Sequence, residues 1–109
     1  MTFAQYQELA ARTALYPGRG QNGYYPAMGL AGEVGEILNK MKKVMRDDGG
    51  VLTEVRKEDL KSELGDVLWY ISALADELHL SLEDIAGANV TKLAGRAQRG
   101  TLHGSGDAR

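Results

Sequence analysis

The acidic side chains best placed to do chemistry in this sequence lie in two copies of one short motif. The first copy is Leu-Ala-Gly-Glu-Val-Gly-Glu-Ile-Leu at residues 30–38, and the second is Leu-Lys-Ser-Glu-Leu-Gly-Asp-Val-Leu at residues 60–68. Each copy places two carboxylates three positions apart, which brings them to one side of an α-helix. The four carboxylates are those of Glu33, Glu36, Glu63 and Asp66. Two such helices packed antiparallel would point all four into one cleft.

Carboxylates that converge in a cleft need protons or cations, because two of them about 5 Å apart repel by about 3 kcal/mol at an effective dielectric constant near 20. Oxygen ligands without histidine or cysteine favour magnesium or manganese over zinc. A di-iron bundle would instead need Glu-x-x-His on two helices, and the only histidines, His79 and His103, do not fit that pattern. The motif pair therefore predicts a site for Mg²⁺, with Mn²⁺ as an alternative.

Basic side chains are expected beside the carboxylates. Lys40 and Lys43 continue the same side of the first motif helix. A later helix carries Asn89 in its apolar stripe, with Lys92 and Arg96 beside it. Cations and an amide next to metal-binding carboxylates suit a substrate with several phosphates. The alternatives are a solvated face or i,i+4 ion pairs for the cations, and a buried hydrogen bond that fixes helix register for the asparagine.

Aromatic side chains could line the same cleft. Tyr70 lies one helical turn beyond Asp66 on the carboxylate side. Residues 16–25 contain three tyrosines among proline, glycine and asparagine, which predicts a loop with stacking groups. Tyr70 could equally be a core residue, and the loop could equally be a simple connector.

Periodicity and caps predict four helices and no strand. The first runs from a Thr2–Gln5 capping box to about residue 15, and the second from Pro26 to about residue 46. The third covers about residues 56–79, and the fourth runs from a Ser81 cap to about residue 99. The two motif helices have matching apolar stripes, formed by Leu30, Val34, Ile37, Leu38 and Met41 and by Leu60, Leu64, Val67, Leu68 and Ile71. We therefore expect an all-α domain over residues 1–100 and a Gly-rich tail over 101–109 that is mobile unless something docks it.

Two features predict further contacts. Glycine in a helix costs roughly 1 kcal/mol relative to alanine, and Gly35 and Gly65 occupy the same place in both motifs. Their matching positions predict close helix approach. Trp69 lies opposite the apolar stripe of its helix, where a small bundle alone would expose it, so we expect a second buried face and a homo-oligomer.

Composition limits the class of protein. The chain has 109 residues and a net charge of -2, which offers no long-range attraction to nucleic acid or to an anionic membrane. Zero cysteines exclude disulfides and a cysteine nucleophile. The first residues lack a signal-peptide pattern, and no apolar run approaches the roughly 20 residues of a membrane span. These features predict a soluble cytoplasmic protein without a nucleic-acid or membrane partner.

The motif pair resembles the signature of the MazG-like, all-α nucleoside triphosphate pyrophosphohydrolases. The signature here is Glu33-x-x-Glu36, a spacer of 26 residues and Glu63-x-x-Asp66. Four stretches, two of them containing the signature itself, are similar to the small single-domain members, so the likeness covers the chain from about residue 6 to its end. They are Gly-Leu-Ala-Gly-Glu-Val-Gly-Glu, Glu-Leu-Gly-Asp-Val-Leu-Trp-Tyr, Asn89-x-x-Lys92-Leu and the Gly-Ser-Gly-Asp-x-Arg tail. One departure is Gly32, where some relatives carry an additional glutamate.

The resemblance implies a four-helix bundle that assembles as a homodimer or homotetramer. It implies Mg²⁺ held by the four motif carboxylates, and cleavage of a nucleoside triphosphate between its α- and β-phosphates to give monophosphate and pyrophosphate. Asn89 and Lys92 would contact phosphates, and Lys92 and Arg96 would offset charge on the leaving pyrophosphate. Glu36 would accept a proton as general base, and the 16–25 loop with Tyr70 would select the nucleotide base.

Two alternatives remain open at this point. A phosphoribosyl-ATP pyrophosphohydrolase-like enzyme is similar in fold and in its use of carboxylates. A non-catalytic helical interaction module would use the apolar helix faces for assembly and leave the carboxylates as surface groups.

Overall fold

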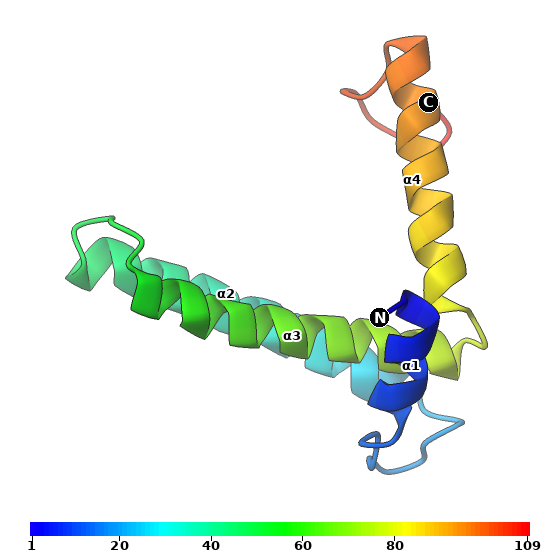
Figure 1. Ribbon diagram of the computed structural model, residues 1–109, viewed down its shortest axis with the longest axis horizontal. Coiled ribbons are helices and arrows are strands. Elements are labelled where there is room, and N and C mark those ends of the chain that lie inside the picture. Colours follow the sequence, from blue (N-terminus) through cyan, green and yellow to red (C-terminus); the bar gives the residue numbers. More distant parts are fainter.

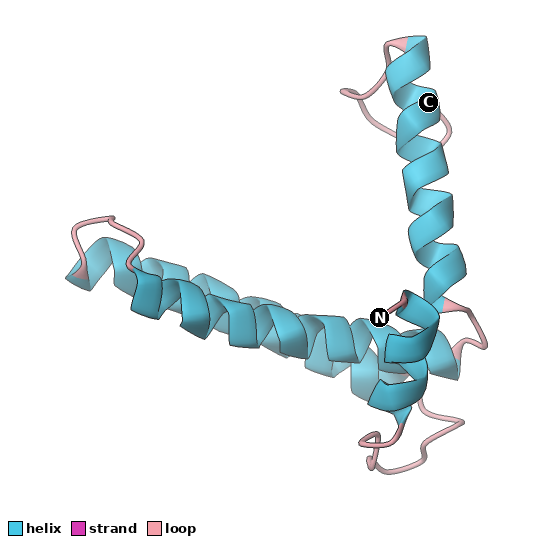
Figure 2. Cartoon of the chain, in the orientation of Figure 1, coloured by secondary structure: helices cyan, strands magenta, loops and turns pink.

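The computed structural model describes all 109 residues and contains four helices and no strand (Figures 1 and 2). The helices are α1 (Phe3–Ala11), α2 (Tyr24–Asp47), α3 (Glu54–Glu77) and α4 (Leu82–Arg99). The all-α prediction is confirmed. The helix bounds differ from the predicted ones by a few residues, chiefly because α1 ends at Ala11 rather than near residue 15. None of the helices combines the length and the apolar character needed to span a membrane.

Short polar side chains set where the helices begin. Thr2 Oγ1 accepts a hydrogen bond from the Gln5 N–H, and the Gln5 side chain accepts one from the Thr2 N–H, which forms the predicted capping box. Ser81 Oγ accepts from the Asp84 N–H at the start of α4, also as predicted. Thr53 caps α3 in the same way. These side chains satisfy N–H groups that have no partner within the helix.

α2 and α3 form a long antiparallel hairpin, and α1 lies across the end where α2 begins and α3 ends (Figure 1). α4 leaves this end at a steep angle and packs against α1 (Figure 1). The four helices therefore do not close into a four-helix bundle within one chain, contrary to the expectation.

The turn after α3 is the physical reason. His79 adopts a left-handed backbone conformation with φ of 55°. The Leu80 N–H donates to the Ala75 carbonyl at 2.8 Å, and the His79 N–H donates to the Asp76 carbonyl at 3.1 Å. This Schellman motif ends α3 abruptly, so the chain turns away from the hairpin before α4 starts.

The single chain is extended for its length. Its radius of gyration is 16.8 Å, whereas a compact domain of this size has a radius of gyration of about 13 Å. Several large apolar side chains on the hairpin and on α4 are exposed: Val34, Leu38, Met41, Met45, Leu64, Ile85, Val90 and Leu93. An exposed apolar surface spread over three helices indicates a site of protein association.

The buried core lies where α1 and the residues after it cover α3. It contains Ala14, Tyr16 and Ala73, with Trp69 packed against them. Trp69 Nε1 donates a hydrogen bond to Thr13 Oγ1 at 2.8 Å. This side of α3 is thus covered within the chain, so Trp69 gives no support to the interchain contact that its helical position suggested.

Gly35 and Gly65 do not mark close helix approach. A Cβ atom at either position would meet nothing within 4 Å, because both glycines lie on open sides of their helices. Within one chain, the prediction of close helix approach at these two glycines is therefore wrong. The motif-helix glycine that does meet the facing helix is Gly29, where a Cβ atom would collide with the ring of Tyr70.

Glu77 fixes the connection between α1 and α2. Its Oε1 accepts hydrogen bonds from the Tyr16 hydroxyl and from the Gly20 N–H, the latter at 2.9 Å, and its Oε2 accepts from the Asn22 N–H at 3.2 Å. Tyr16 also stacks on Tyr25, with ring centroids 4.8 Å apart. Burial, followed by the hydrogen bond to Glu77, raises the pKa of Tyr16 to about 12, so its hydroxyl remains a donor at neutral pH.

Glu77 should make the stability of the fold depend on pH. The hydrogen bonds from Tyr16, Gly20 and Asn22, with Tyr16 contributing most, lower the pKa of Glu77 below its ordinary value. Its stabilising contribution is therefore present above pH of about 4 and is lost as the pH falls through the lowered pKa. We expect Glu77→Gln to lower the Tm at pH 7 and the difference from wild type to shrink in acid.

Thermal unfolding measured at several pH values tests this expectation. Glu58→Gln is the matched control, because Glu58 is an exposed carboxylate on the same helix whose only ion pair is with Lys61 at 3.7 Å. A loss of Tm in Glu77→Gln that is the same at every pH would contradict an ionised, hydrogen-bonded Glu77.

Residues 101–109 fold back on the end of α4. The Arg109 side chain donates hydrogen bonds to the carbonyls of Thr101 at 3.0 Å, Leu102 at 3.0 Å and Gly106 at 2.6 Å. Arg99 donates to the Arg109 carbonyl at 2.9 Å. The tail therefore docks on α4 of its own chain, which is the condition under which it is expected to be ordered.

Candidate metal site

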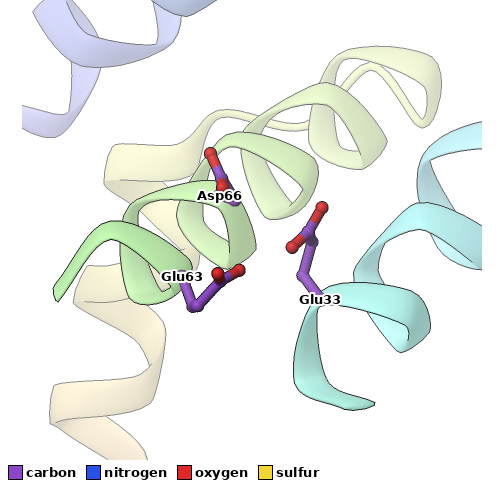
Figure 3. Close-up of side chains that lie close together, drawn as sticks. All are labelled: Glu33, Glu63 and Asp66. Atoms are coloured by element: carbon purple, nitrogen blue, oxygen red, sulfur yellow. The ribbon is translucent and has the colours of Figure 1, made fainter. Parts of the chain in front are cut away.

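The hairpin brings three of the four motif carboxylates together (Figure 3). One oxygen from each of Glu33, Glu63 and Asp66 lies within 4.8 Å of the others. Glu33 extends from α2, and Glu63 and Asp66 extend from α3, with the Glu63 carboxylate directed toward Glu33 (Figure 3). We call these three residues the acidic cluster.

Glu36 lies outside the acidic cluster. It is exposed on α2, whereas Glu33 is half-buried. The helical wheel explains the difference, because Glu36 is turned about 60° further from the apolar stripe than Glu33. Its negative charge still contributes to raising the pKa of Glu33, so it acts on the cluster at longer range.

The carboxylates of the cluster perturb one another. Burial raises the pKa of Glu33, and the hydrogen bond to Glu63 and the charge of Asp66 raise it further. The Lys40 ammonium lies 2.6 Å from Glu63 Oε1, and this contact lowers the pKa of Glu63. In the absence of another cation, Glu33 therefore takes up a proton more readily than Glu63 does.

The donor set fits a hard divalent cation. All the donors are carboxylate oxygens held by two helices, which is the ligand chemistry that magnesium and manganese prefer. Lys40 balances one negative charge of the cluster. A bound cation would relieve the remaining repulsion, which contributes to the raised pKa of Glu33.

A pocket of about 340 Å³ opens beside the cluster. Its lining residues are Thr13, Glu33, Asp66, Trp69 and Tyr70. The rings of Trp69 and Tyr70 meet edge to face, with centroids 5.0 Å apart and planes at 89°. Burial raises the pKa of Tyr70, and the neighbouring Tyr25, Glu33 and Asp66 add to the effect. The pocket therefore combines an aromatic wall, carrying a protonated tyrosine hydroxyl, with an acidic edge.

Two of the lining residues are absent from the predicted site. Trp69 follows Asp66 by three positions, so it shares a side of α3 with Asp66 as Tyr70 does, and this spacing was a usable signal. Thr13 carries no such signal. It lies beyond the end of α1 and reaches the pocket only because the chain folds over α3, where it accepts the Trp69 indole hydrogen bond.

The predicted phosphate-binding residues are not gathered at the cluster within one chain. Lys40 contacts the acidic cluster by its ion pair with Glu63, and Lys43 lies further along α2. Asn89 and Lys92 are exposed on α4, which packs on α1 rather than on the hairpin. The structure thus leaves these two side chains available to a second molecule.

Arg96 is engaged by the C-terminal tail. Its side chain is 6% exposed, and its Nη2 donates a hydrogen bond to the Asp107 carbonyl at 3.0 Å. The Thr101 N–H donates to the Arg96 carbonyl at 2.8 Å and anchors the start of the tail. The structure therefore does not present Arg96 to a phosphate, contrary to the expectation from sequence.

Comparison with known proteins is consistent with the geometry. Residues 26–101 match the model of the MazG nucleotide pyrophosphohydrolase domain. The gene 37 protein of Mycobacterium phage L5 is 47% identical over 109 residues, an alignment that covers 95% of this chain and 96% of the phage protein. No solved structure gave a match. The matched domain begins in the first turn of α2 and includes the hairpin with all four motif carboxylates.

Proposed function

Because this chain belongs to the MazG nucleotide pyrophosphohydrolase family, we propose that it hydrolyses a nucleoside triphosphate to nucleoside monophosphate and pyrophosphate with Mg²⁺. The observation that carries the proposal is the acidic cluster of Glu33, Glu63 and Asp66 within 4.8 Å, which borders the aromatic pocket. A place for a divalent cation beside a pocket of ligand size is what this reaction requires.

The reaction breaks one phosphoanhydride bond. The oxygen of water bonds to the α-phosphorus, the bond from that phosphorus to the bridging oxygen breaks, and pyrophosphate leaves with the electron pair. The cluster, with Glu36 beside it, would hold Mg²⁺ or Mn²⁺. The bound ion would offset phosphate charge and lower the pKa of water. Glu36 is exposed and outside the cluster, so it is our candidate for the general base that accepts the proton.

The pocket would receive the nucleoside part of the substrate. Trp69 and Tyr70 provide ring surfaces at 5.0 Å from one another, and Thr13 and Tyr70 carry hydroxyl groups. Aromatic faces with a few polar groups are typical of sites that bind flat, partly polar ligands. No residue of the 16–25 loop lines this pocket. We therefore assign nucleotide selection to the pocket. Of residues 16–25, only Tyr25, which lies in the first turn of α2 near Tyr70, would contribute to it.

We further propose that the protein is a homodimer or a pair of dimers in which α4 of one chain packs on the hairpin of another. The support is that α4 does not pack on its own hairpin. Both surfaces expose apolar side chains, Val90 and Leu93 on α4 and Leu38 and Met45 on the hairpin. A two-fold axis would bury both pairs at once. It would also bring Asn89 and Lys92 toward the phosphates held at the other chain's acidic cluster.

A nucleotide panel tests the reaction. We expect purified protein with Mg²⁺ to release pyrophosphate from at least one canonical or damaged nucleoside triphosphate, and chelation of the metal to stop turnover. Product analysis is the measurement. Orthophosphate and diphosphate as the first products would exclude this reaction.

The two alternative functions are tested by the same nucleotide panel and by metal binding. Phosphoribosyl-ATP belongs in the panel, because the acidic cluster would suit that substrate equally, and turnover far faster than that of any free triphosphate would reassign the enzyme. Titration calorimetry addresses the non-catalytic module. Failure to take up Mg²⁺ or Mn²⁺, with or without nucleotide, would favour a helical interaction protein.

A further inference from the structure

A close contact between the two hairpin helices lies one turn from the acidic cluster. Gly29 precedes Glu33 by one turn on α2, and Tyr70 follows Asp66 by one turn on α3. A Cβ atom at position 29 would lie 2.6 Å from Cδ1 of Tyr70 and closer still to Cε1 and Cζ. Carbon atoms do not approach so closely in a packed interior, so only glycine fits against the ring in this position.

The neighbouring glycines of α2 have no comparable contact. A Cβ atom at Gly32 or Gly35 would meet nothing within 4 Å. Glycine inside a helix is unfavourable relative to alanine. At position 29 the Tyr70 ring excludes any larger residue, whereas no neighbouring atom does so at positions 32 and 35.

The surroundings of Tyr70 determine where its ring would go if it were displaced. One side of the ring lies against Gly29, and Trp69 meets it edge to face at 5.0 Å. Tyr70 also lines the pocket, together with Glu33 and Asp66. Rotating one side chain disturbs less packing than separating two helices of 24 residues each. A side chain at position 29 would therefore push the ring into the pocket.

We propose that Gly29 is a positioning residue that sets the width of the pocket. By carrying no side chain, it lets the Tyr70 ring lie against α2 and keeps the space beside the acidic cluster open for the base or sugar of a nucleotide. The inference rests on the proposed function, because it takes this pocket as the place where the nucleoside part of the substrate binds. Gly29 itself acts through Tyr70.

The test compares Gly29→Ala with Gly32→Ala, which adds the same methyl group to the next turn of the same helix. We expect Gly29→Ala to raise the KM for the preferred nucleoside triphosphate by about tenfold or more, with kcat changed much less. Gly32→Ala should leave KM unchanged. Trp69 is the only tryptophan, so its fluorescence reports the displaced ring, and its emission should change in Gly29→Ala alone.

Combining Gly29→Ala with Tyr70→Ala separates the proposal from a general packing defect. Once the ring has been removed, the added methyl group should no longer change KM relative to Tyr70→Ala alone, and it should raise Tm, as replacing glycine by alanine inside a helix does. The double variant also keeps the proposal testable if Gly29→Ala by itself folds poorly, because removal of the ring should restore folding.

Three outcomes would overturn the proposal. They are wild-type KM and wild-type Trp69 emission in Gly29→Ala, an equal effect of the methyl group in the Tyr70→Ala background, and the same emission change in Gly32→Ala. If the wild-type protein hydrolyses no nucleotide, it is the proposed function that fails. The contact of Gly29 with Tyr70 is then still decided by Trp69 emission and by the recovery of Tm in the double variant.

Discussion

Replacing Glu33, Glu63 or Asp66 by its amide should lower turnover by about 100-fold or more. Each substitution removes a negative charge and a ligand oxygen from the group that lies within 4.8 Å, so each weakens the hold on the cation on which the proposed reaction depends. Glu36→Gln should have a comparable effect if Glu36 accepts the proton. Pyrophosphate release at saturating Mg²⁺ measures all of these variants, and Glu58→Gln on α3 is the control that should keep wild-type turnover.

Double variants within the acidic cluster should lose little more turnover than the single variants do. A site that has already lost its metal cannot lose it a second time, so the effects of Glu33→Gln and Asp66→Asn should be strongly non-additive. If the fold-losses in turnover of the two single variants multiply in the double variant, the carboxylates act independently rather than as one metal site.

Without metal, Glu33→Gln should not lower the stability of the protein, although the same substitution lowers turnover when metal is present. The pKa of Glu33 is raised, first by burial and then by its acidic neighbours, so its ionisation opposes folding increasingly as the pH rises through that pKa. Glu33→Gln should therefore leave the Tm unchanged or raise it at neutral pH without metal, and salt should reduce the gain. Glu63→Gln should not share this gain, because Glu63 is paired with Lys40 at 2.6 Å. A Glu33→Gln apoprotein that unfolds would show a structural carboxylate and contradict the metal site.

Mixing two inactive variants should restore activity if α4 serves the hairpin of another chain. Glu33→Gln damages the hairpin, and Lys92→Ala damages α4, so each homo-oligomer should be nearly inactive. A mixed dimer would contain one site with an intact hairpin and an intact α4. With random exchange of subunits, we expect about a quarter of the wild-type activity.

The control mixture is Glu33→Gln with Asp66→Asn. Both substitutions lie in the hairpin, so no combination of these chains yields an intact site, and activity should stay low. Recovery in this control, or no recovery in the first mixture, would contradict an α4 that acts between chains. Sedimentation provides an independent check, because a monomer at micromolar concentration would exclude the assembly.

The helices and the pairing of carboxylates on them followed from the sequence alone. Capping by Thr2 and Ser81 and the 3.6-residue spacing of apolar side chains are local properties, so they can be recognised without knowing the tertiary structure. The repeated motif also identified the family that the match over residues 26–101 confirms. The caps and the apolar and acidic sides of the helices depend on residues within one or two helical turns of each other, and the family signature depends on residue types at fixed spacing.

Only the tertiary structure decided which of these residues meet. Gly29 and Gly35 carry the same local cost in a helix, yet only Gly29 faces an aromatic ring, because packing between helices is set by residues far away in the sequence. Trp69 belongs to a second apolar face that periodicity can reveal, but periodicity does not show that residues 13–16 cover it.

The direction of α4 is the largest such effect. It depends on a left-handed backbone conformation at His79. The sequence does not predict this conformation at a histidine, because glycine is the usual residue at this position of the turn. That single turn removes Asn89 and Lys92 from the cluster of their own chain and leaves their helix free for a second one. Local spacing determines which side of a helix is apolar or acidic, whereas the turn between helices determines what that side meets.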